Sequence, residues 1–205
     1  MAEPIVSRKT LYLIVVIAVA LLWVVGTLLT GPSAAALTLV IRALALAGYF
    51  FIFLAILSSA YLRELVKAFG RPFIKVHHIV SITGLVAIGL HPVAVAIDYR
   101  SASVFAPSIG TLTETLAWLG RPAWYLLLIA ALTAFLRTRV GNIWRAIHYV
   151  NYIAFLAATV HGNLMGGNFG YVVPRIISIV MAAIVIAVFI WRRMQAAKRP
   201  ARARK

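Results

Sequence analysis

The chain has 205 residues, of which 63% are hydrophobic and only 12% are charged. Soluble domains are roughly half apolar and about a quarter charged, and one core of this size could not bury so much apolar surface, so an ordinary soluble enzyme is excluded, as is a disordered chain. The chain carries 20 Lys and Arg against 4 Asp and Glu, a net charge of +16, and no cysteine, which also excludes disulfides, iron–sulfur clusters and thiolate-ligated haem.

Apolar runs of transmembrane length follow one another along the whole chain. A membrane-spanning helix needs about 20 mostly apolar residues, and Gly31-Pro32 ends the first such run. Pro122 falls in the first turn of the fourth run, where a missing N–H costs little. The sequence predicts an all-α, polytopic integral membrane bundle of six helices forming a single domain. The expected spans are about residues 11–30, 43–62, 76–97, 122–136, 143–160 and 172–191, followed by a basic tail at 192–205.

The first apolar run has an alternative interpretation as a signal peptide. The basic stretch Ser7-Arg8-Lys9 precedes it, and small residues follow it at 32–36, as they do at a cleavage site. The run at 11–30 is longer than the roughly 7–15 residues of a usual signal-peptide core. We therefore expect it to be retained as a membrane span.

The basic residues are distributed unevenly between the two sides of the predicted membrane. With the N-terminus in the cytoplasm, 16 of the 20 Lys and Arg fall in inner segments, and the outer segments hold only Arg42, Arg100, Arg121 and Arg175. Cytoplasmic loops carry such an excess, so we expect a protein of the cell membrane with both termini cytoplasmic. The 192–205 tail is expected to meet anionic lipid headgroups, and no nucleic acid is expected as a partner.

The longest predicted outer connection runs from residue 98 to residue 120. Within it, Ile109, Leu112, Leu116 and Leu119 fall on one face of a possible short helix. Such a helix fits the membrane interface. A lid or docking surface on the outer side is the alternative.

The histidines carry most of the functional information. All five fall in the third and fifth predicted spans, and they are His77, His78, His91, His148 and His161. Ionisable residues inside a membrane are costly and are usually functional. His77 and His91 are 14 residues apart, and His148 and His161 are 13 apart, which on a helix is about 20 Å in each case. Because both spans start inside, the spacing predicts two levels, each with one imidazole from each span.

Two levels of paired imidazoles suit two stacked haems, each with two axial histidines. Neutral imidazole is a common ligand of haem iron, and two such ligands leave no open position, which favours electron transfer. On an ideal helix a 14-residue step returns to within about 40° of its starting face, whereas a 13-residue step ends about 140° away. His77 is therefore favoured over His78 as the inner ligand, with His78 as the alternative, and a local irregularity is needed between His148 and His161.

Glycines and basic residues near these histidines have two interpretations each. Gly84 and Gly89 could let a flat macrocycle approach the backbone, or they could serve close helix packing. The basic residues at the inner ends of the two spans could pair with haem propionates or anchor the helix ends, and they are Arg71, Lys75, Arg139 and Arg145.

Two sequence segments resemble the ferric reductase-like transmembrane domain shared by ferric reductases and NADPH oxidases. They are VHHIVSITGLVAIGLH in the third span and RVGNIWRAIHYVNYIAFLAATVHG around the fifth, which includes Trp144, His148 and Tyr152 at intervals of four. The resemblance covers about residues 40–165. It implies two stacked b-type haems, with iron ligands matching His77, His91, His148 and His161. The length and span number are also similar to the stand-alone MsrQ type, the haem subunit of a periplasmic methionine sulfoxide reductase.

Many members of that family continue into a cytoplasmic domain that binds FAD and NADPH, and no G-x-G-x-x-G motif of that kind occurs in this chain. We therefore expect an oxidoreductase component that receives electrons from a flavin reductase, a bound or partner-supplied flavin, or a membrane quinol. The acceptor would be ferric iron, oxygen or an outer redox protein. The alternatives are a histidine-dependent metal-ion or proton transporter and a non-catalytic membrane anchor subunit. The scarcity of intramembrane carboxylates weakens the transporter alternative.

Overall fold

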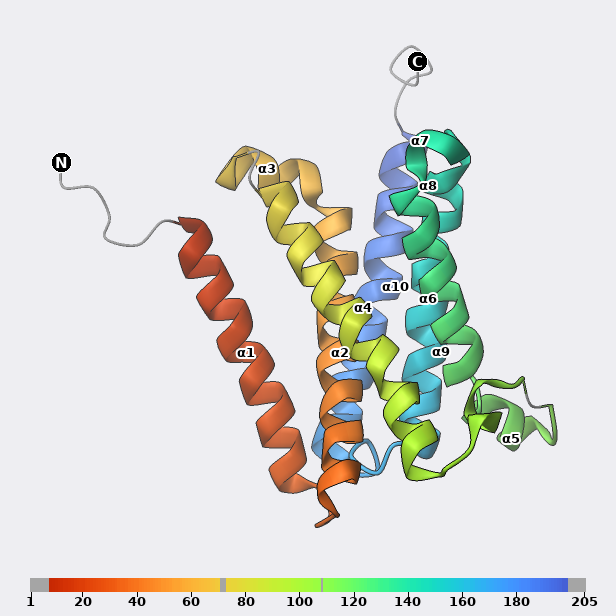
Figure 1. Cartoon of the computed structure of the whole chain (residues 1–205). Coiled ribbons are helices and arrows are strands. Elements are labelled where there is room, and N and C mark those ends of the chain that lie inside the picture. Colours follow the sequence, from red (N-terminus) through yellow and green to blue (C-terminus); the bar gives the residue numbers. More distant parts are fainter. Residues whose placement is uncertain (1–7, 71–72, 108, 199–205) are drawn as a thin grey trace.

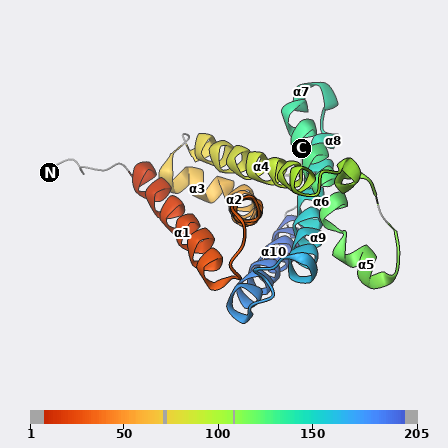
Figure 2. The same ribbon diagram turned by 60° about the horizontal axis from the view of Figure 1, so that its bottom comes forward.

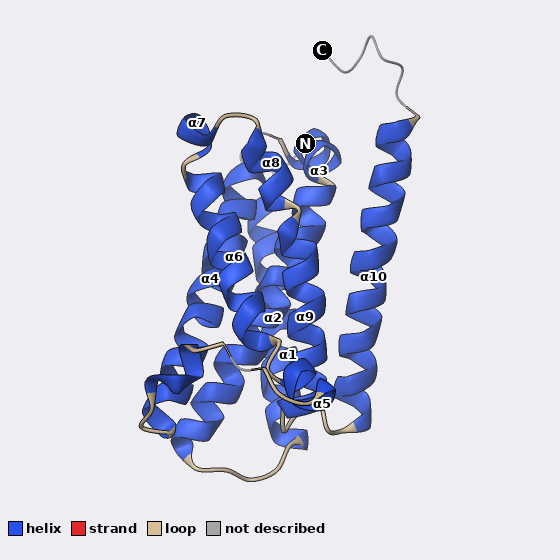
Figure 3. Cartoon of the chain, turned by 90° about the vertical axis from the view of Figure 1, so that its right-hand side faces the viewer, coloured by secondary structure: helices blue, strands red, loops and turns tan. Residues whose placement is uncertain are grey.

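A computed structural model describes residues 8–70, 73–107 and 109–198, and in this part of the chain it contains helices and loops but no strand (Figures 1 and 3). The predicted all-α class is therefore confirmed. The elements in chain order are α1 (Arg8–Thr30), α2 (Ala36–Ala60), α3 (Leu62–Phe69), α4 (Phe73–Asp98), the short 3₁₀ helix η1 (Ala102–Phe105), α5 (Leu112–Ala117), α6 (Gly120–Phe135), α7 (Arg137–Val140), α8 (Ile143–His148), α9 (Val150–Met165) and α10 (Val172–Ala197).

The long helices are roughly aligned along one axis of the bundle, and the chain runs up some of them and down others (Figure 1). The start of α1, the end of α10, and the short helices α3, α7 and α8 lie at one end of the bundle (Figure 1). We call this the α3–α8 end, and the opposite one, which carries α5, the α5 end. The chain follows the same direction in α4 and α9, from the α3–α8 end to the α5 end. This agrees with the expectation that the two histidine-bearing spans are parallel.

Four helical segments in the described part of the chain are long and apolar enough to cross a membrane. They are α2, α4, the 112–135 segment containing α5 and α6, and α10. The apolar part of α1, Ile14–Leu29, is shorter than this criterion, and α9 has 16 residues. Integral membrane character is thus supported, while the full number of six spans stays a prediction.

The expected fifth span is broken into two helices in the structure. Instead of one helix over 143–160, α8 ends at His148 and α9 begins at Val150. At the junction the backbone makes tighter i to i−3 hydrogen bonds, from Tyr149 N to Ala146 O (3.2 Å) and from Tyr152 N to Tyr149 O (3.1 Å). Because a 3₁₀ turn winds more tightly than an α-helix, the phase expected for an ideal helix does not apply across this junction. The local irregularity needed between His148 and His161 is present.

Two glycines allow α2 and α4 to approach closely. A Cβ added at Gly48 would lie 2.9 Å from the backbone N of Ile88, and one at Gly84 would lie 3.1 Å from the backbone N of Ile52. Small residues permit such contacts between membrane helices. Gly84 therefore serves helix packing, the second of its two interpretations, whereas a Cβ at Gly89 would meet no atom within 4 Å.

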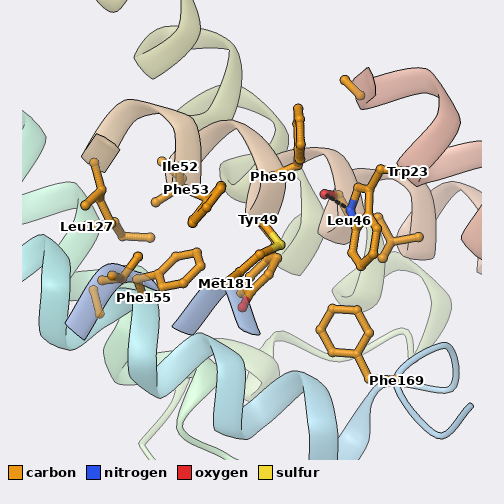
Figure 4. Packing of buried hydrophobic residues seen from close by; sticks show 14 residues of the cluster. Trp23, Leu46, Tyr49, Phe50, Ile52, Phe53, Leu127, Phe155, Phe169 and Met181 are labelled. Atoms are coloured by element: carbon orange, nitrogen blue, oxygen red, sulfur yellow. Dashed lines mark hydrogen bonds between the residues drawn. The ribbon is translucent and has the colours of Figure 1, made fainter. Parts of the chain in front are cut away.

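The main buried core is aromatic and lies between α1, α2, α9 and α10 (Figure 4). The Tyr49 ring stacks on Phe155 with centroids 4.5 Å apart, and the Tyr49 hydroxyl donates to the Ser178 carbonyl at 3.1 Å. Trp23 Nε1 donates to Leu46 O at 3.1 Å. Many large apolar side chains face outward instead, as membrane helices require, because lipid is their solvent.

The 98–120 connection forms two short helices beside the bundle. Thr111 and Glu114 cap α5 reciprocally, a capping box that satisfies backbone donors at its start. α5 packs against α9, next to the start of α6 (Figure 2). Ile109 lies outside the short helix and is 91% exposed, so the expected four-residue apolar face is only partly formed.

Candidate functional site

The two histidine-bearing helices are held apart. α4 packs along α2, and α9 packs along α6, but α4 and α9 make almost no close backbone contact with each other over their lengths. Side chains from both sides of this separation line a cavity near the α3–α8 end. This cavity lies between the helices that carry His77 and His148.

That cavity brings together the two histidines predicted for the inner level. His77 from α4 and His148 from α8 both line it, together with Ser81, Asn151 and Tyr152. Its room for water-sized molecules is about 60 Å³, and its total empty space, including the part open to the outside, is about 500 Å³. Small and apolar side chains from α2 and α6 complete the walls, and they include Ala55, Leu127 and Ala131.

His77 is oriented by a serine on α2. Ser58 Oγ lies 2.8 Å from His77 Nδ1, and the same hydroxyl donates to Ala55 O at 3.1 Å. Because a hydroxyl has a single proton, Ser58 Oγ then accepts the Nδ1–H of His77. This tautomer leaves the lone pair on Nε2 of His77 available to a metal.

His148 is held more loosely. The amide nitrogen of Asn151 lies 3.3 Å from its Nδ1 and 3.4 Å from its Nε2, and the backbone of Ala130 on α6 also interacts with the ring. The Trp144 ring meets the His148 ring edge-on with centroids 5.8 Å apart. No single hydrogen bond selects a tautomer here.

The outer pair is oriented by main-chain carbonyl groups. His91 Nδ1 donates to Ile41 O at 3.1 Å, and His161 Nδ1 donates to Ala117 O at 2.5 Å. A carbonyl oxygen can only accept, so both rings carry the proton on Nδ1 and present the lone pair on Nε2. The His161 ring also lies against Gly120, where an added Cβ would be 2.6–2.8 Å from its Cδ2, Nε2 and Cγ atoms.

At the inner level, His77 and His148 line one cavity. In the described part of the chain no group of three or more His, Cys, Asp or Glu side chains could hold a metal ion. The structure brings His77 and His148 to one cavity, and the pairing of His91 with His161 stays a prediction.

The other predicted site residues lie outside these pairs. His78 is exposed, and its ring centroid is 5.9 Å from that of His77. Arg145 is also exposed; its guanidinium lies 5.5 Å from the Trp144 ring centroid and donates to Asn142 Oδ1 at 3.2 Å. Lys75 and Arg139 are exposed, and Arg71 lies outside the described residues.

Several residues that shape the pairs were missed by sequence reasoning. Ser58 and Asn151 are polar positions inside apolar runs, and this signal could have singled them out. Gly120 gave only a weak signal, as a glycine before a proline-containing helix start. The carbonyls of Ile41 and Ala117 carry no sequence signal, since every residue has one.

The donor set fits the haem irons expected from the sequence. A metal-bound histidine almost always donates its other ring N–H to a carbonyl or similar acceptor, which fixes the tautomer and makes the ligand more basic. His77, His91 and His161 all have this arrangement. At the inner level, His77 and His148 face one cavity between their helices.

The comparison with protein families gives one match. The model of the family described as ferric reductase like transmembrane component matches residues 42–159, a range that contains all of α4, α6 and α8 and most of α9. No curated protein and no solved structure matches the chain.

Proposed function

The chain belongs to the ferric reductase-like transmembrane component family, and from this premise we propose that it is a membrane electron-transfer protein holding two b-type haems. It receives electrons at the α3–α8 end from a cytoplasmic-side donor and passes them to an acceptor at the α5 end. The family match covers residues 42–159, which include His77, His91 and His148 and end two residues before His161. Membership thereby supports a redox role in the membrane.

The observation that carries the proposal is the pairing of imidazoles from two separated helices. In this proposal His77 pairs with His148, with which it lines one cavity, and His91 pairs with His161. Three of the four rings have Nδ1 bonded to an oxygen. In each of these rings the proton on Nδ1 leaves the Nε2 lone pair available. Paired Nε2 lone pairs are the donor set of an iron with two axial histidines.

The residues of the chain would bind the haem and orient the histidine rings. When bound, haem supplies an iron that gains and loses one electron at a time. Ser58 and the carbonyls of Ile41 and Ala117 hold the histidine rings in one tautomer, and this preorganisation raises ligand basicity. The walls of the cavity are mainly apolar, and the polarity around a metal site is a means by which a protein tunes a redox potential.

The direction of transfer is supported by the distribution of charge. Arg63, Lys67, Arg137, Arg139 and Arg193 belong to helices at the α3–α8 end, and Arg42, Arg100, Arg121 and Arg175 lie toward the α5 end. Because Lys and Arg are concentrated in cytoplasmic segments, the α3–α8 end faces the cytoplasm. A flavin reductase, a flavin or a quinol would deliver electrons there.

The test is a haem-to-protein ratio combined with a redox titration of the full chain purified from membranes. The expected result is about two b-type haems per chain, with two separable reduction steps. A preparation expressed with adequate haem supply that contains no reducible b-type absorption would overturn the proposal.

A further inference from the structure

A cluster of buried polar side chains lies where α2, α9 and α10 pack against one another. Tyr49 of α2 is 5% exposed, Thr159 of α9 is 7% exposed, and Ser178 of α10 is fully buried. The Tyr49 hydroxyl lies 2.9 Å from Thr159 Oγ1 and donates to Ser178 O at 3.1 Å. One hydroxyl group thus bridges three helices inside an otherwise apolar core.

Two further contacts extend this junction along α9. The Tyr49 ring stacks on Phe155 with centroids 4.5 Å apart (Figure 4), and Asn163 Nδ2 donates to Ser178 Oγ at 3.0 Å. Phe155, Thr159 and Asn163 follow one another at intervals of four residues, so they lie on one face of the helix. We call these three residues the α9 stripe, and its contacts are with α2 and α10.

His161 projects from the opposite side of α9. It lies two residues after Thr159, the middle of the α9 stripe, and two residues on an α-helix correspond to a turn of about 200°, so the two side chains point about 160° apart. On its own side the His161 ring donates to Ala117 O and lies against Gly120. One side of α9 is thus fastened to the core, and the other side carries the predicted outer ligand.

The rotation of α9 about its own axis therefore decides where His161 Nε2 points. A helix with its side chains has a radius of about 5–6 Å, so a rotation of about 10° moves a side-chain tip by about 1 Å. Functional groups in a site must be held within about 0.5 Å of their working positions. A rotation of α9 would separate Thr159 from Tyr49 and Asn163 from Ser178, so the contacts of the α9 stripe oppose it.

We propose that Tyr49 is a positioning residue for the outer haem: its hydroxyl fixes the rotation of α9 and thereby the direction of His161. This inference rests on the proposed function, which assigns His161 to a haem. The inner level should not respond, because His148 belongs to α8 and the 3₁₀ turn at Tyr149 separates α8 from α9.

The substitution Tyr49→Phe tests the hydroxyl alone, because it keeps the ring that stacks on Phe155. The full chain with its haems is studied by redox titration and by electron paramagnetic resonance, since the signal of a low-spin haem depends on the angle between its two imidazole planes. The outer haem is identified as the one lost in His161→Ala. We expect both haems to stay bound, with a shifted outer signal and outer midpoint potential and unchanged inner values. Thr159→Val should give the same shift, and the double variant should shift the outer haem no further, because both changes remove one contact.

Tyr12→Phe is the matched control. The Tyr12 ring contacts Phe69 and Phe73 at the α3–α8 end, and loss of its hydroxyl should leave both haems unchanged. If Tyr49→Phe lowered the melting temperature but kept the outer signal and potential, Tyr49 would serve packing only, and the proposal would be overturned. Equal shifts at both levels, or a shift of the same size in Tyr12→Phe, would overturn it as well.

A second measurement follows the rotation of α9 without relying on haem. The chain has no cysteine, so cysteines introduced at the exposed positions Val160 on α9 and Ile129 on α6 can carry spin labels. The distribution of distances between the labels should shift or broaden in Tyr49→Phe and stay the same in Tyr12→Phe. An unchanged distribution in Tyr49→Phe overturns this inference alone. Absence of haem from the unmodified chain overturns the proposed function instead, and the label distances still decide whether Tyr49 sets the rotation of α9.

Discussion

The two histidine levels differ in what holds their imidazole rings. At the outer level, His91 and His161 both donate to main-chain carbonyls. At the inner level, His77 depends on the hydroxyl of Ser58, and His148 has only longer contacts with Asn151. The outer level is thus oriented by the backbone of neighbouring helices, and the inner level is oriented by side chains.

This difference affects how easily substitutions can change the properties of each level. A main-chain acceptor is present whatever the residue, so substitution cannot remove it, whereas a serine or asparagine can be replaced. Partners of metal-ligating histidines set ligand orientation and basicity. The inner level should therefore respond to single substitutions in its surroundings, and the outer level should change mainly when its packing is disturbed.

Removal of a proposed ligand histidine should have the largest effect, because one level then loses its haem and the other keeps it. His161→Ala takes one imidazole from the outer level and leaves the inner pair intact, so haem content should fall from about two per chain to about one. His148→Ala should remove the inner haem in the same way and leave a different residual midpoint potential. Haem quantification with a redox titration measures both effects.

His78→Ala is the matched control for these variants. His78 neighbours His77 in sequence but is exposed, so its loss should leave both haems in place. If His78→Ala removed a haem while His77→Ala did not, the inner pairing would be wrong.

Gly120→Ala should disturb the outer level next most strongly. The added Cβ would lie 2.6–2.8 Å from ring atoms of His161, and overpacking of this kind costs about 1–3 kcal/mol. We expect partial loss of the outer haem with an unchanged inner spectrum. Gly26→Ala on α1 is the control, because a Cβ there also meets no atom within 4 Å; equal effects of the two changes would refute the packing argument.

Ser58→Ala should affect the inner haem alone, and its effect on haem binding should be smaller than that of Gly120→Ala on the outer haem. The substitution removes the acceptor for His77 Nδ1–H, and loss of such a partner typically weakens metal affinity about 10–100-fold. Competition with apomyoglobin for haem would measure the affinity, and a titration should show a raised inner potential because the ligand is less basic. A shift of the outer potential instead would contradict the assignment of Ser58 to His77.

The smallest expected effect concerns an ion pair at the α3–α8 end. Arg192 Nη1 donates to Glu64 Oε1 at 2.9 Å and holds the pKa of that carboxyl below its usual range. A carboxyl with a lowered folded-state pKa adds stability above its unfolded pKa and loses it as the pH falls through the folded value. Because Glu64 is half-exposed, the contribution should stay below about 1 kcal/mol.

The measurement for this pair is the melting temperature of Glu64→Gln against the unmodified chain. A small decrease is expected at pH 7, and the difference should shrink as the pH falls through the lowered folded-state pKa of Glu64. Arg192 also acts on Tyr152 of the histidine cavity, so any redox change should appear at the inner level. A difference that grows with acidity would contradict the sign.

The site was predictable to the extent that its chemistry is local in sequence. The spacing of His77 from His91 and of His148 from His161 predicted two levels; the structure places His77 and His148 at one cavity, and the outer pairing stays a prediction. The phase of His148 could not be predicted, because it depends on the junction between α8 and α9 at Tyr149. The two interpretations of Gly84 could be separated only by its contact with α2.

The sequence by itself determined the membrane character, the all-helical class, the family and the histidines worth attention, because hydropathy and residue spacing act over a few helical turns. Tertiary structure alone decided what orients each ring and which cavity each residue lines. The Ile41 carbonyl reaches His91 across 50 residues of chain, and the Ala117 carbonyl reaches His161 across 44. Such contacts arise from the packing of distant helices, and backbone acceptors, which every residue has, leave no mark in a sequence.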